Sequence, residues 1–303
     1  MARRFAVLDV FTDTPLTGNG LAVVRDAGGL TSEAMQAIAR GFNLSETVFL
    51  LPADGPAHTA KMRIFTPARE LPFAGHPTVG AAVLLTLDRF EGDAAGRDAV
   101  VVIEEEVGPV RCGVATASNR AGYAEFDVPR IAGAIPCTLD RDAVAGALGL
   151  LPSEIGFENH VPSAYDAGVP FTFVPVANLD AARKAAPILA LWKSAFGPDA
   201  PASVYLYCRD TIRSDASFHA RMFAPTFGIG EDPATGAAAS AFAGVVHRFD
   251  APPDGEHKVA IEQGVEMGRP SLIRLELEIA RGAIANARIG GDAVVIQEGE
   301  LFV

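Results

Sequence analysis

Arg63-Ile64-Phe65-Thr66-Pro67 has a counterpart in Arg221-Met222-Phe223-Ala224-Pro225, and the two stretches open an internal repeat. His76-Pro77-Thr78-Val79-Gly80-Ala81-Ala82 is matched in the same order by Asp232-Pro233-Ala234-Thr235-Gly236-Ala237-Ala238. One short match is expected by chance in an alanine-rich chain, whereas two matches in the same order favour duplication. The sequence therefore predicts a fold built from two related halves.

Each copy of the repeat predicts the same local structure. A strand ends at Phe-x-Pro, a loop follows, and a helix then opens with a polar residue, a proline and small residues. A polar N-cap side chain can accept from the backbone N–H groups of the first turn, and proline is tolerated at the next position. We therefore expect His76 and Asp232 to stand at the openings of two helices, over residues 77–87 and 234–249, where either could cap the first turn.

Both expected helices are apolar on almost every side, as in the run 81–85. A helix without a polar face is buried, so each half should wrap a sheet around a central helix. Strands and helices alternate irregularly elsewhere, which favours mixed sheets over a regular doubly wound one. Helix N-termini carry partial positive charge, so two of them facing a shared cleft would suit a carboxylate.

The bulk composition limits the class of protein. A length of 303 residues favours two domains, and the stretch 129–136, rich in proline, glycine and alanine, is the expected linker. A net charge of −12 argues against nucleic acid and anionic membranes as partners. No apolar run approaches the roughly 20 residues of a membrane span. Three widely spaced cysteines form no disulfide pattern and indicate a cytoplasmic protein.

Several common functional motifs are absent from the sequence. Gly18-Asn19-Gly20 lacks the third glycine of a dinucleotide-binding loop, and there is no Gly-Lys-Ser/Thr phosphate loop. Six histidines are scattered without an H-E-x-x-H pair, so no metal site is predicted. The G-x-S-x-G elbow of many hydrolases is missing as well.

Three polar residues are candidates for catalysis. Glu46 stands just before the apolar run 48–51, where desolvation would raise its carboxyl pKa toward the range useful at neutral pH. His76 at a helix start should remain a neutral imidazole, which can donate or accept. Asp232 either caps its helix or faces the cleft and orients a substrate hydroxyl or amine. The structural alternatives are a simple helix-to-strand turn for Glu46 and a cap without substrate for His76.

The polar, glycine-punctuated stretch 262–271 lies between two expected strands. One interpretation is a segment that closes the site. The other is a hairpin in which Arg269 pairs with a local carboxylate, and this second interpretation is favoured.

Taken together, four motifs resemble the PhzF-like (phenazine-biosynthesis-type) isomerase family. They are Asn-Leu-Ser-Glu46, Glu70-Leu-Pro-Phe-Ala-Gly-His76-Pro-Thr, Glu231-Asp232-Pro-Ala-Thr-Gly236 and Gln263-Gly-Val-Glu-Met-Gly-Arg-Pro-Ser271. The resemblance implies the diaminopimelate-epimerase-like α/β fold, with two pseudo-symmetric halves, each a curved mixed sheet around a central helix. In that fold the C-terminal strand returns to the first half, so the expected domains are 1–120 with 285–303, and 121–284.

The resemblance also implies a function and a set of site residues. Family members are commonly homodimers, need no cofactor, and work on a small carboxylic acid in a cleft between the halves. Glu46 matches the proton-shuttling carboxylate, and His76 and Asp232 match residues that hold and polarise the substrate. The implied substrate-binding positions are Gly75, Thr235, Gly236 and Ala237. Ala237 stands where the family often has serine, which puts the phenazine substrate itself in doubt.

We therefore expect an isomerase in which Glu46 removes a proton next to an unsaturated carboxylic acid and returns it to another carbon. One rival is a racemase or epimerase with two bases on opposite faces of the substrate. The epimerase relatives use two thiols at the helix starts, and none of Cys112, Cys137 and Cys208 lies there. The other rival is a small-molecule binder without catalysis on the same fold.

Overall fold

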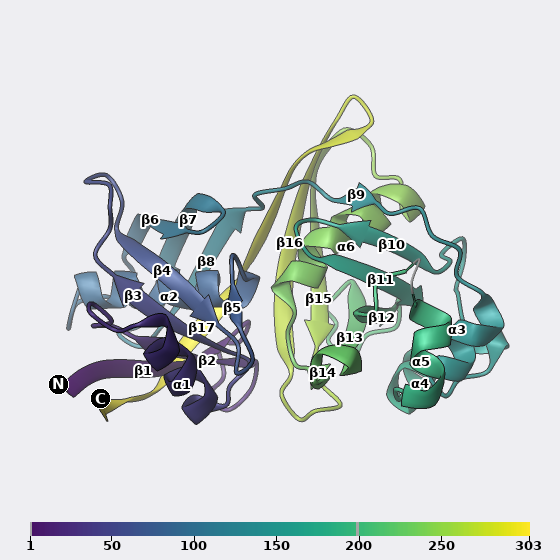
Figure 1. Ribbon diagram of the computed structural model, residues 1–303. Helices are drawn as coiled ribbons and strands as arrows, with labels where there is room; N and C mark the ends of the chain where they lie inside the picture. The colour runs from purple at the N-terminus through teal and green to yellow at the C-terminus, as the bar shows by residue number, and fades with distance from the viewer. Residues whose placement is uncertain (1, 198–199) are drawn as a thin grey trace. The chain divides into compact units, whose positions relative to one another are not determined.

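Strands dominate over helices, and together they form two units (Figure 1). The structure is a computed structural model that describes residues 2–197 and 200–303. The first unit comprises Met1–Asp127 and Gly290–Val303, and the second comprises Val128–Ile289. The domain limits expected from the sequence, at 120 and 284, each fall a few residues before these boundaries. The predicted mixed α/β class is confirmed.

In the first unit, a ring of strands encloses one helix. Its elements are β1 (Ala2–Val10), β2 (Asn19–Val24), α1 (Ser32–Phe42), β3 (Glu46–Leu51), β4 (Ala60–Phe65), β5 (Glu70–Leu71), α2 (Gly75–Arg89), β6 (Asp98–Glu105), β7 (Gly108–Thr116), β8 (Ala121–Asp127) and the last part of β17 (Ala283–Phe302). Pairing runs from β1 through β2, β3, β4, β6, β7, β8 and β17 back to β1. A closed ring leaves no strand edge open to pairing with other chains.

The second unit has the same kind of sheet. Its elements are β9 (Gly133–Ala134), α3 (Arg141–Ala147), η1 (Pro152–Glu154), β10 (Ser163–Asp166), β11 (Pro170–Pro175), α4 (Leu179–Lys184), α5 (Leu189–Phe196), β12 (Val204–Cys208), β13 (Phe218–Ala224), η2 (Pro225–Phe227), β14 (Ile229–Asp232), α6 (Gly236–Phe249), β15 (Gly255–Gln263), β16 (Ser271–Ala280) and the first part of β17. Pairing follows the order β9, β10, β11, β12, β13, β15, β16, and β14 pairs with β13.

The strand directions of the two units agree step by step. β2–β3 and β11–β12 are parallel, and β3–β4 and β12–β13 are antiparallel. β4–β6 and β13–β15 are again parallel, and β6–β7 and β15–β16 are antiparallel. In each unit a short strand also pairs with the equivalent neighbour: β5 pairs with β4, and β14 pairs with β13. This agreement confirms the duplication predicted from the repeat.

Each unit has a buried central helix, as predicted from the apolar sequence. α2 packs against β1, β2, β3, β6, β7 and β8, and α6 packs against β9, β10, β11 and β16. Glycine permits the close approach of α2 to the sheet. A Cβ atom at Gly80 would lie 2.5 Å from Cδ2 of Leu21 and 2.9 Å from Cγ2 of Val10, so a larger residue would push the helix away.

The remaining helices cover the outer faces of the sheets. α1 buries Met35 and Ala39 against the first unit, and Trp192 and Phe196 of α5 are fully buried in a core of the second unit. The sequence analysis assigned no element to α4 or α5, because helices of six and eight residues carry little periodic signal.

The predicted linker over 129–136 is only partly a connection. Residues 133–134 form β9, and Ala134 pairs with Tyr165 of β10. The stretch therefore contributes a strand to the second unit, whose boundary lies before it.

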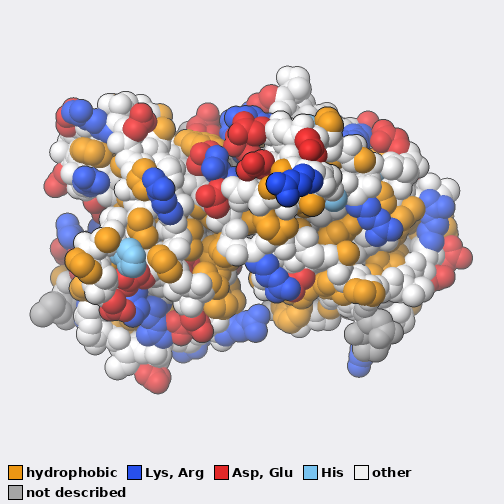
Figure 2. Space-filling model, turned by 90° about the horizontal axis from the view of Figure 1, so that it is seen from above, with side chains coloured by type: hydrophobic (Ala, Val, Ile, Leu, Met, Phe, Trp, Pro, Cys, Tyr) orange, Lys and Arg blue, Asp and Glu red, His pale blue; other side chains and the backbone are white. Residues whose placement is uncertain are grey.

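Among the described residues, no helix is long and apolar enough to cross a membrane. On the face that Figure 2 shows, acidic and basic side chains are interspersed with apolar ones. Together with the net charge of −12, this mixture gives no support to a polyanionic partner.

Candidate active site

Glu46 begins β3 directly after a reversal of the chain. α1 is capped by Asn43, whose left-handed backbone (φ 52°) turns the chain and whose N–H donates to the carbonyl of Ala39. β3 then pairs in parallel with β2, which places Glu46 opposite Leu21. The segment is thus the helix-to-strand turn foreseen as an alternative, yet it also buries most of the Glu46 side chain, which is 16% exposed.

The imidazole of His76 lies against this carboxyl group. Nε2 of His76 is 3.2 Å from Oε2 of Glu46, although the pair lacks the alignment of a hydrogen bond. Burial lowers the pKa of His76 to about 3, so the imidazole is neutral at physiological pH. The prediction of a neutral imidazole is confirmed, but the cause is desolvation rather than the helix dipole.

α2 begins one residue before His76. Its N-cap is Ala74, and no side chain caps the helix. The prediction that His76 is the cap is therefore wrong, because its imidazole lies beside Glu46 instead. Gly75 and His76 occupy the first turn, whose backbone N–H groups have no side-chain cap and suit an anion.

A second carboxyl group lies beneath the same turn, and the sequence analysis missed it. Glu105, the last residue of β6, is buried, and its Oε1 is 2.8 Å from Oγ1 of Thr78 in α2. Burial raises the pKa of Glu105 to about 8. The pattern of β6 shows how it could have been found, because Val101, Ile103 and Glu105 alternate and are all buried.

Asp232 ends β14, where it pairs with Met222 of β13, and it is buried. α6 begins four residues later at Gly236, with Thr235 as N-cap and no side-chain cap bond. Of the two roles left open for Asp232, that of the α6 cap is therefore excluded. Its Oδ2 instead accepts a 2.5 Å hydrogen bond from the hydroxyl of Thr235, which fixes the carboxylate beside the helix start.

Gln263 holds the start of α6 from beneath. Its Oε1 accepts from the backbone N–H of Thr235 at 3.1 Å and from the hydroxyl of Tyr205 at 3.1 Å. Its Nε2 donates to the carbonyl of Asp232 at 2.8 Å and to Oγ1 of Thr235 at 3.0 Å. Gly236 is buried at the first helical position, and Ala237 is partly exposed beside it.

The stretch 262–271 forms the hairpin that was favoured from the sequence, while the pairing of Arg269 with a carboxylate stays a prediction. It joins β15 to β16, whose residues Gln263 and Ser271 pair with each other. The hydroxyl of Ser271 donates to the carbonyl of Pro233 at 2.9 Å, which ties the hairpin to the residue after Asp232. The hairpin therefore supports the site residue from behind.

A buried chain of charges reinforces this hairpin, and the sequence analysis did not foresee it. His219 of β13 is fully buried between two carboxylates, with Nδ1 2.8 Å from Glu262 and Nε2 3.1 Å from Glu266. Burial opposes its charge, but these hydrogen bonds raise the pKa of His219 to about 9. His219 is therefore a cation at neutral pH that holds the hairpin residue Glu266 against β13.

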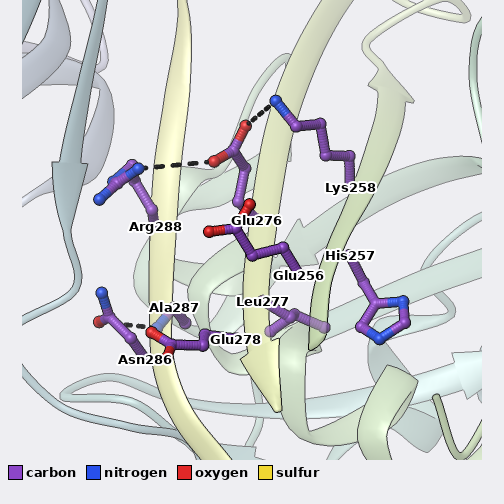
Figure 3. A pocket seen from close by; sticks show the side chains of 9 residues that line it. All are labelled: Glu256, His257, Lys258, Glu276, Leu277, Glu278, Asn286, Ala287 and Arg288. Carbon is purple, nitrogen blue, oxygen red and sulfur yellow. Dashed lines mark hydrogen bonds and ion pairs between the residues drawn. The ribbon is translucent and has the colours of Figure 1, made fainter. Parts of the chain in front are cut away.

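A separate depression lies on the outer face of β15, β16 and β17 (Figure 3). It measures about 50 Å³, and Glu276 at its rim pairs with Lys258 at 2.8 Å and Arg288 at 3.5 Å. It contains none of the predicted site residues. Within residues 2–197 and 200–303, no cluster of histidine, cysteine or carboxylate side chains suits a metal ion.

The structure thus brings the predicted residues together in two groups. Glu46 and His76 meet in the first unit, and Asp232 and Thr235 meet in the second. The joint action of both groups on one substrate remains a prediction from the sequence.

Residues 8–299 match the family model of the PhzC-PhzF phenazine biosynthesis-like proteins. The chain belongs to this family. A relative, an uncharacterized isomerase of Mesorhizobium japonicum, is 50% identical, with 99% of both chains covered. The trans-2,3-dihydro-3-hydroxyanthranilate isomerase of Pseudomonas fluorescens is 33% identical, again with 99% of both chains covered. The crystal structure of a PhzF-family protein of Bacillus anthracis aligns over 100% of both chains with a TM-score of 0.87 and 26% identity. The chain is thus a PhzF-family isomerase.

Proposed function

We propose that this isomerase moves a proton between two carbons of a small unsaturated carboxylic acid that resembles trans-2,3-dihydro-3-hydroxyanthranilate. The observation that carries the proposal is the pair formed by Glu46 and His76, whose side chains are only 16% and 6% exposed and lie 3.2 Å apart. A further support is the 33% identity to an isomerase named for that substrate.

In the proposed mechanism, the carboxylate of Glu46 takes a proton from a carbon next to the unsaturated system. The electron pair released by that C–H bond shifts along the conjugated system, and the same carboxyl returns the proton to a second carbon on the same face. Neutral His76 cannot repel a cationic substrate amine, and one of its ring nitrogens can donate to a substrate oxygen. No atom is gained or lost, so the reaction needs no co-reactant.

The second unit is proposed to hold the substrate. Asp232, kept in place by Thr235 and Gln263, would accept from a substrate hydroxyl or amine. The substrate carboxylate would lie at the uncapped starts of α2 and α6, at Gly75 and Gly236. Ala237 offers no hydroxyl there, so the substrate should lack the polar group that serine would meet.

The proposal includes the setting in which the enzyme works. We propose a cytoplasmic homodimer that uses no cofactor and no metal. All three cysteines, Cys112, Cys137 and Cys208, are free thiols, which fits a reducing compartment. A two-thiol racemase is disfavoured because Cys112 lies in β7 and Cys208 in β12, so neither thiol belongs to the first turn of a central helix. Burial raises the pKa of both thiols, which keeps them protonated at neutral pH and leaves no thiolate to act as a base.

The test is a screen of unsaturated amino and hydroxy acids, including trans-2,3-dihydro-3-hydroxyanthranilate, in heavy water with proton NMR detection. We expect migration of a C–H bond, and loss of turnover in Glu46→Gln with folding and ligand binding retained. Glu91→Gln serves as the control, because Glu91 is exposed at the end of α2 and should leave turnover unchanged.

Three outcomes would contradict the proposal in different ways. Full activity of Glu46→Gln would remove the assigned base. Deuterium uptake at a single stereocentre, with inversion, would favour a two-base racemase. Binding of an acid without any exchange would favour the non-catalytic alternative.

A further inference from the structure

Glu105 and Gln263 occupy equivalent positions in the two units. β4 pairs with β6 so that Lys61 faces Glu104, and β13 pairs with β15 so that His219 faces Glu262. Arg63 and Arg221 are separated by a certain number of residues along the chain. Glu104 and Glu262 are separated by the same number, and so are Glu105 and Gln263. The repeat therefore extends to Ile103-Glu104-Glu105 and Ile261-Glu262-Gln263.

Hydrogen bonds confirm this equivalence independently. Glu104 accepts from the backbone N–H groups of Asp54 and Gly55, at 2.9 and 2.8 Å. Glu262 accepts from those of Ile212 and Arg213, at 2.7 and 2.8 Å. These donors are separated by the same interval as the carboxylates that they bind. The next residue in each strand, Glu105 or Gln263, then lies beneath the start of the central helix.

In the second unit, each hydrogen bond at the start of α6 has a defined donor and acceptor. Nε2 of Gln263 donates to Oγ1 of Thr235, and that hydroxyl donates to Oδ2 of Asp232. An amide nitrogen carries two hydrogens and a hydroxyl carries one, so each contact has its own hydrogen. The start of α6 is therefore held without any conflict between acceptors.

In the first unit, the corresponding line works only if Glu105 carries a proton. Oγ1 of Thr78 is 2.8 Å from the carbonyl oxygen of Ala74 and 2.8 Å from Oε1 of Glu105. The carbonyl can only accept, and the single hydroxyl hydrogen cannot serve two acceptors fully. A proton on Glu105 resolves the conflict, because Glu105 then donates to Thr78 and Thr78 donates to Ala74.

The surroundings of Glu105 agree with this assignment. Oε2 has no hydrogen-bond partner and is buried, which is costly for a carboxylate and much less so for a neutral acid. The groups facing it are the Thr78 hydroxyl of α2 and the Cys112 thiol of β7, and both are neutral. The Glu105 pKa of about 8, which burial raises, is consistent with a proton at neutral pH.

We propose that Glu105 is a positioning residue for His76, and that its protonated carboxyl holds the first turn of α2 through Thr78 as the amide of Gln263 holds the start of α6. The inference deepens the proposed function, because His76 acts beside Glu46 in the reaction. Loss of the Glu105 proton leaves Thr78 between two acceptors, so the turn that carries His76 shifts. Displacements of about 1 Å in such a turn can lower turnover roughly a hundredfold.

The first experiment needs no substrate. The imidazole signals of His76 are followed by NMR from about pH 6 to pH 10, a range that spans the raised Glu105 pKa, and are identified by their loss in His76→Asn. In the wild type we expect a titration step near the Glu105 pKa of about 8, although the imidazole itself stays neutral. In Glu105→Gln, whose amide can donate to Thr78, the step should vanish. In Glu106→Gln, one residue along and exposed, it should persist.

The second experiment measures turnover of the substrate found in the screen. Wild-type activity should fall about tenfold per pH unit above the Glu105 pKa, and Glu105→Gln should keep its activity there. Glu105→Ala and Thr78→Val should lose activity at every pH, so retention of activity by Glu105→Gln marks the donated hydrogen bond.

The two experiments separate the possible failures. A His76 titration that is identical in the wild type and Glu105→Gln would overturn the role of Glu105, whether or not a substrate is found. If that step vanishes in Glu105→Gln but no acid is isomerised, the positioning role stands and the proposed reaction fails. An alkaline loss of turnover that persists in Glu105→Gln would also contradict the inference.

Discussion

The two units share one strand order but bury their equivalent charges to different depths. In the first unit, Arg63 pairs with Glu70 at 2.6 Å, with side chains 26% and 35% exposed. In the second, Arg221 pairs with Glu231 at 2.8 Å, with side chains only 8% and 17% exposed. Arg221 also donates to the carbonyls of Ala182 and Ala185.

The difference shows that a duplicated backbone can organise its helix start in two ways. The second unit surrounds the start of α6 with buried ions, from Glu262 through His219 to Glu266. The first unit keeps its ions near the surface and places one neutral acid beneath α2. His76 is therefore kept uncharged by its burial, although the carboxyl of Glu46 lies beside it, whereas Asp232 is fixed by a polar network.

The largest expected effect comes from Glu105→Gln, which gives the first unit the amide that Gln263 supplies in the second. The Glu105 pKa is raised from 4.5 in the unfolded chain to about 8 in the fold, so its contribution to stability is complete below pH 4.5 and declines up to about pH 8. Glu105→Gln removes this loss and should be more stable than the wild type at pH 9, by on the order of 5 kcal/mol. Urea unfolding at pH 4.5, 7 and 9 measures the difference, which should be small only at the lowest pH.

The reverse exchange is the matched control. Gln263→Glu should introduce a stability loss at rising pH into the second unit. A Glu105→Gln variant whose stability parallels that of the wild type at all three pH values would contradict the assignment of the proton.

The next effect distinguishes the two arginines. Arg221→Met leaves Glu231 buried without its partner and should cost roughly 3–5 kcal/mol of unfolding free energy. Arg63→Met removes a more exposed pair and should cost at most about 1 kcal/mol. Guanidinium-induced unfolding of both variants gives the comparison. Equal losses would mean that burial does not set the contribution of these pairs.

The smallest of the three effects concerns the residue after Gln263. Gly264 has a left-handed backbone (φ 76°), and a Cβ atom there would lie 2.5 Å from the carbonyl oxygens of Arg269 and Pro233. Gly264→Ala should therefore destabilise the protein by about 1–3 kcal/mol. Glu106 is the equivalent residue of the first unit and is exposed, so Glu106→Ala should change the unfolding midpoint little. A tolerated alanine at 264 would show that the hairpin moves freely behind Pro233.

Much of the fold was predictable because the repeat lies in the sequence itself. The motifs at His76 and Asp232 indicated two buried helices, and the apolar runs after them gave their burial. The helix starts were not predictable, because Ala74 and Thr235 become N-caps only through contacts made elsewhere in each unit. Local preference favours a polar residue as the cap of each helix. It is overridden because His76 lies against Glu46 and Asp232 bonds to Thr235.

The site was only partly visible for a related reason. Glu46 and His76 belong to recognisable motifs, whereas Glu105 is the middle of three consecutive glutamates that look like a solvated run. Its burial follows from the alternation of β6, which turns Val101, Ile103 and Glu105 to the same side. His219 gave no signal, because its two carboxylate partners are far from it in sequence.

β17 has a consequence for how the protein is made. Its last residues, from Gly290 onward, complete the ring whose other strands all come from the first 127 residues. When the first 127 residues have been synthesised, β1 and β8 each have an edge that only β17 can pair with. Both edges stay open until β17 has been made. Completion of the unit that holds Glu46 and His76 is thus postponed until β17 has been synthesised, and a variant that lacks Gly290–Val303 should have no activity.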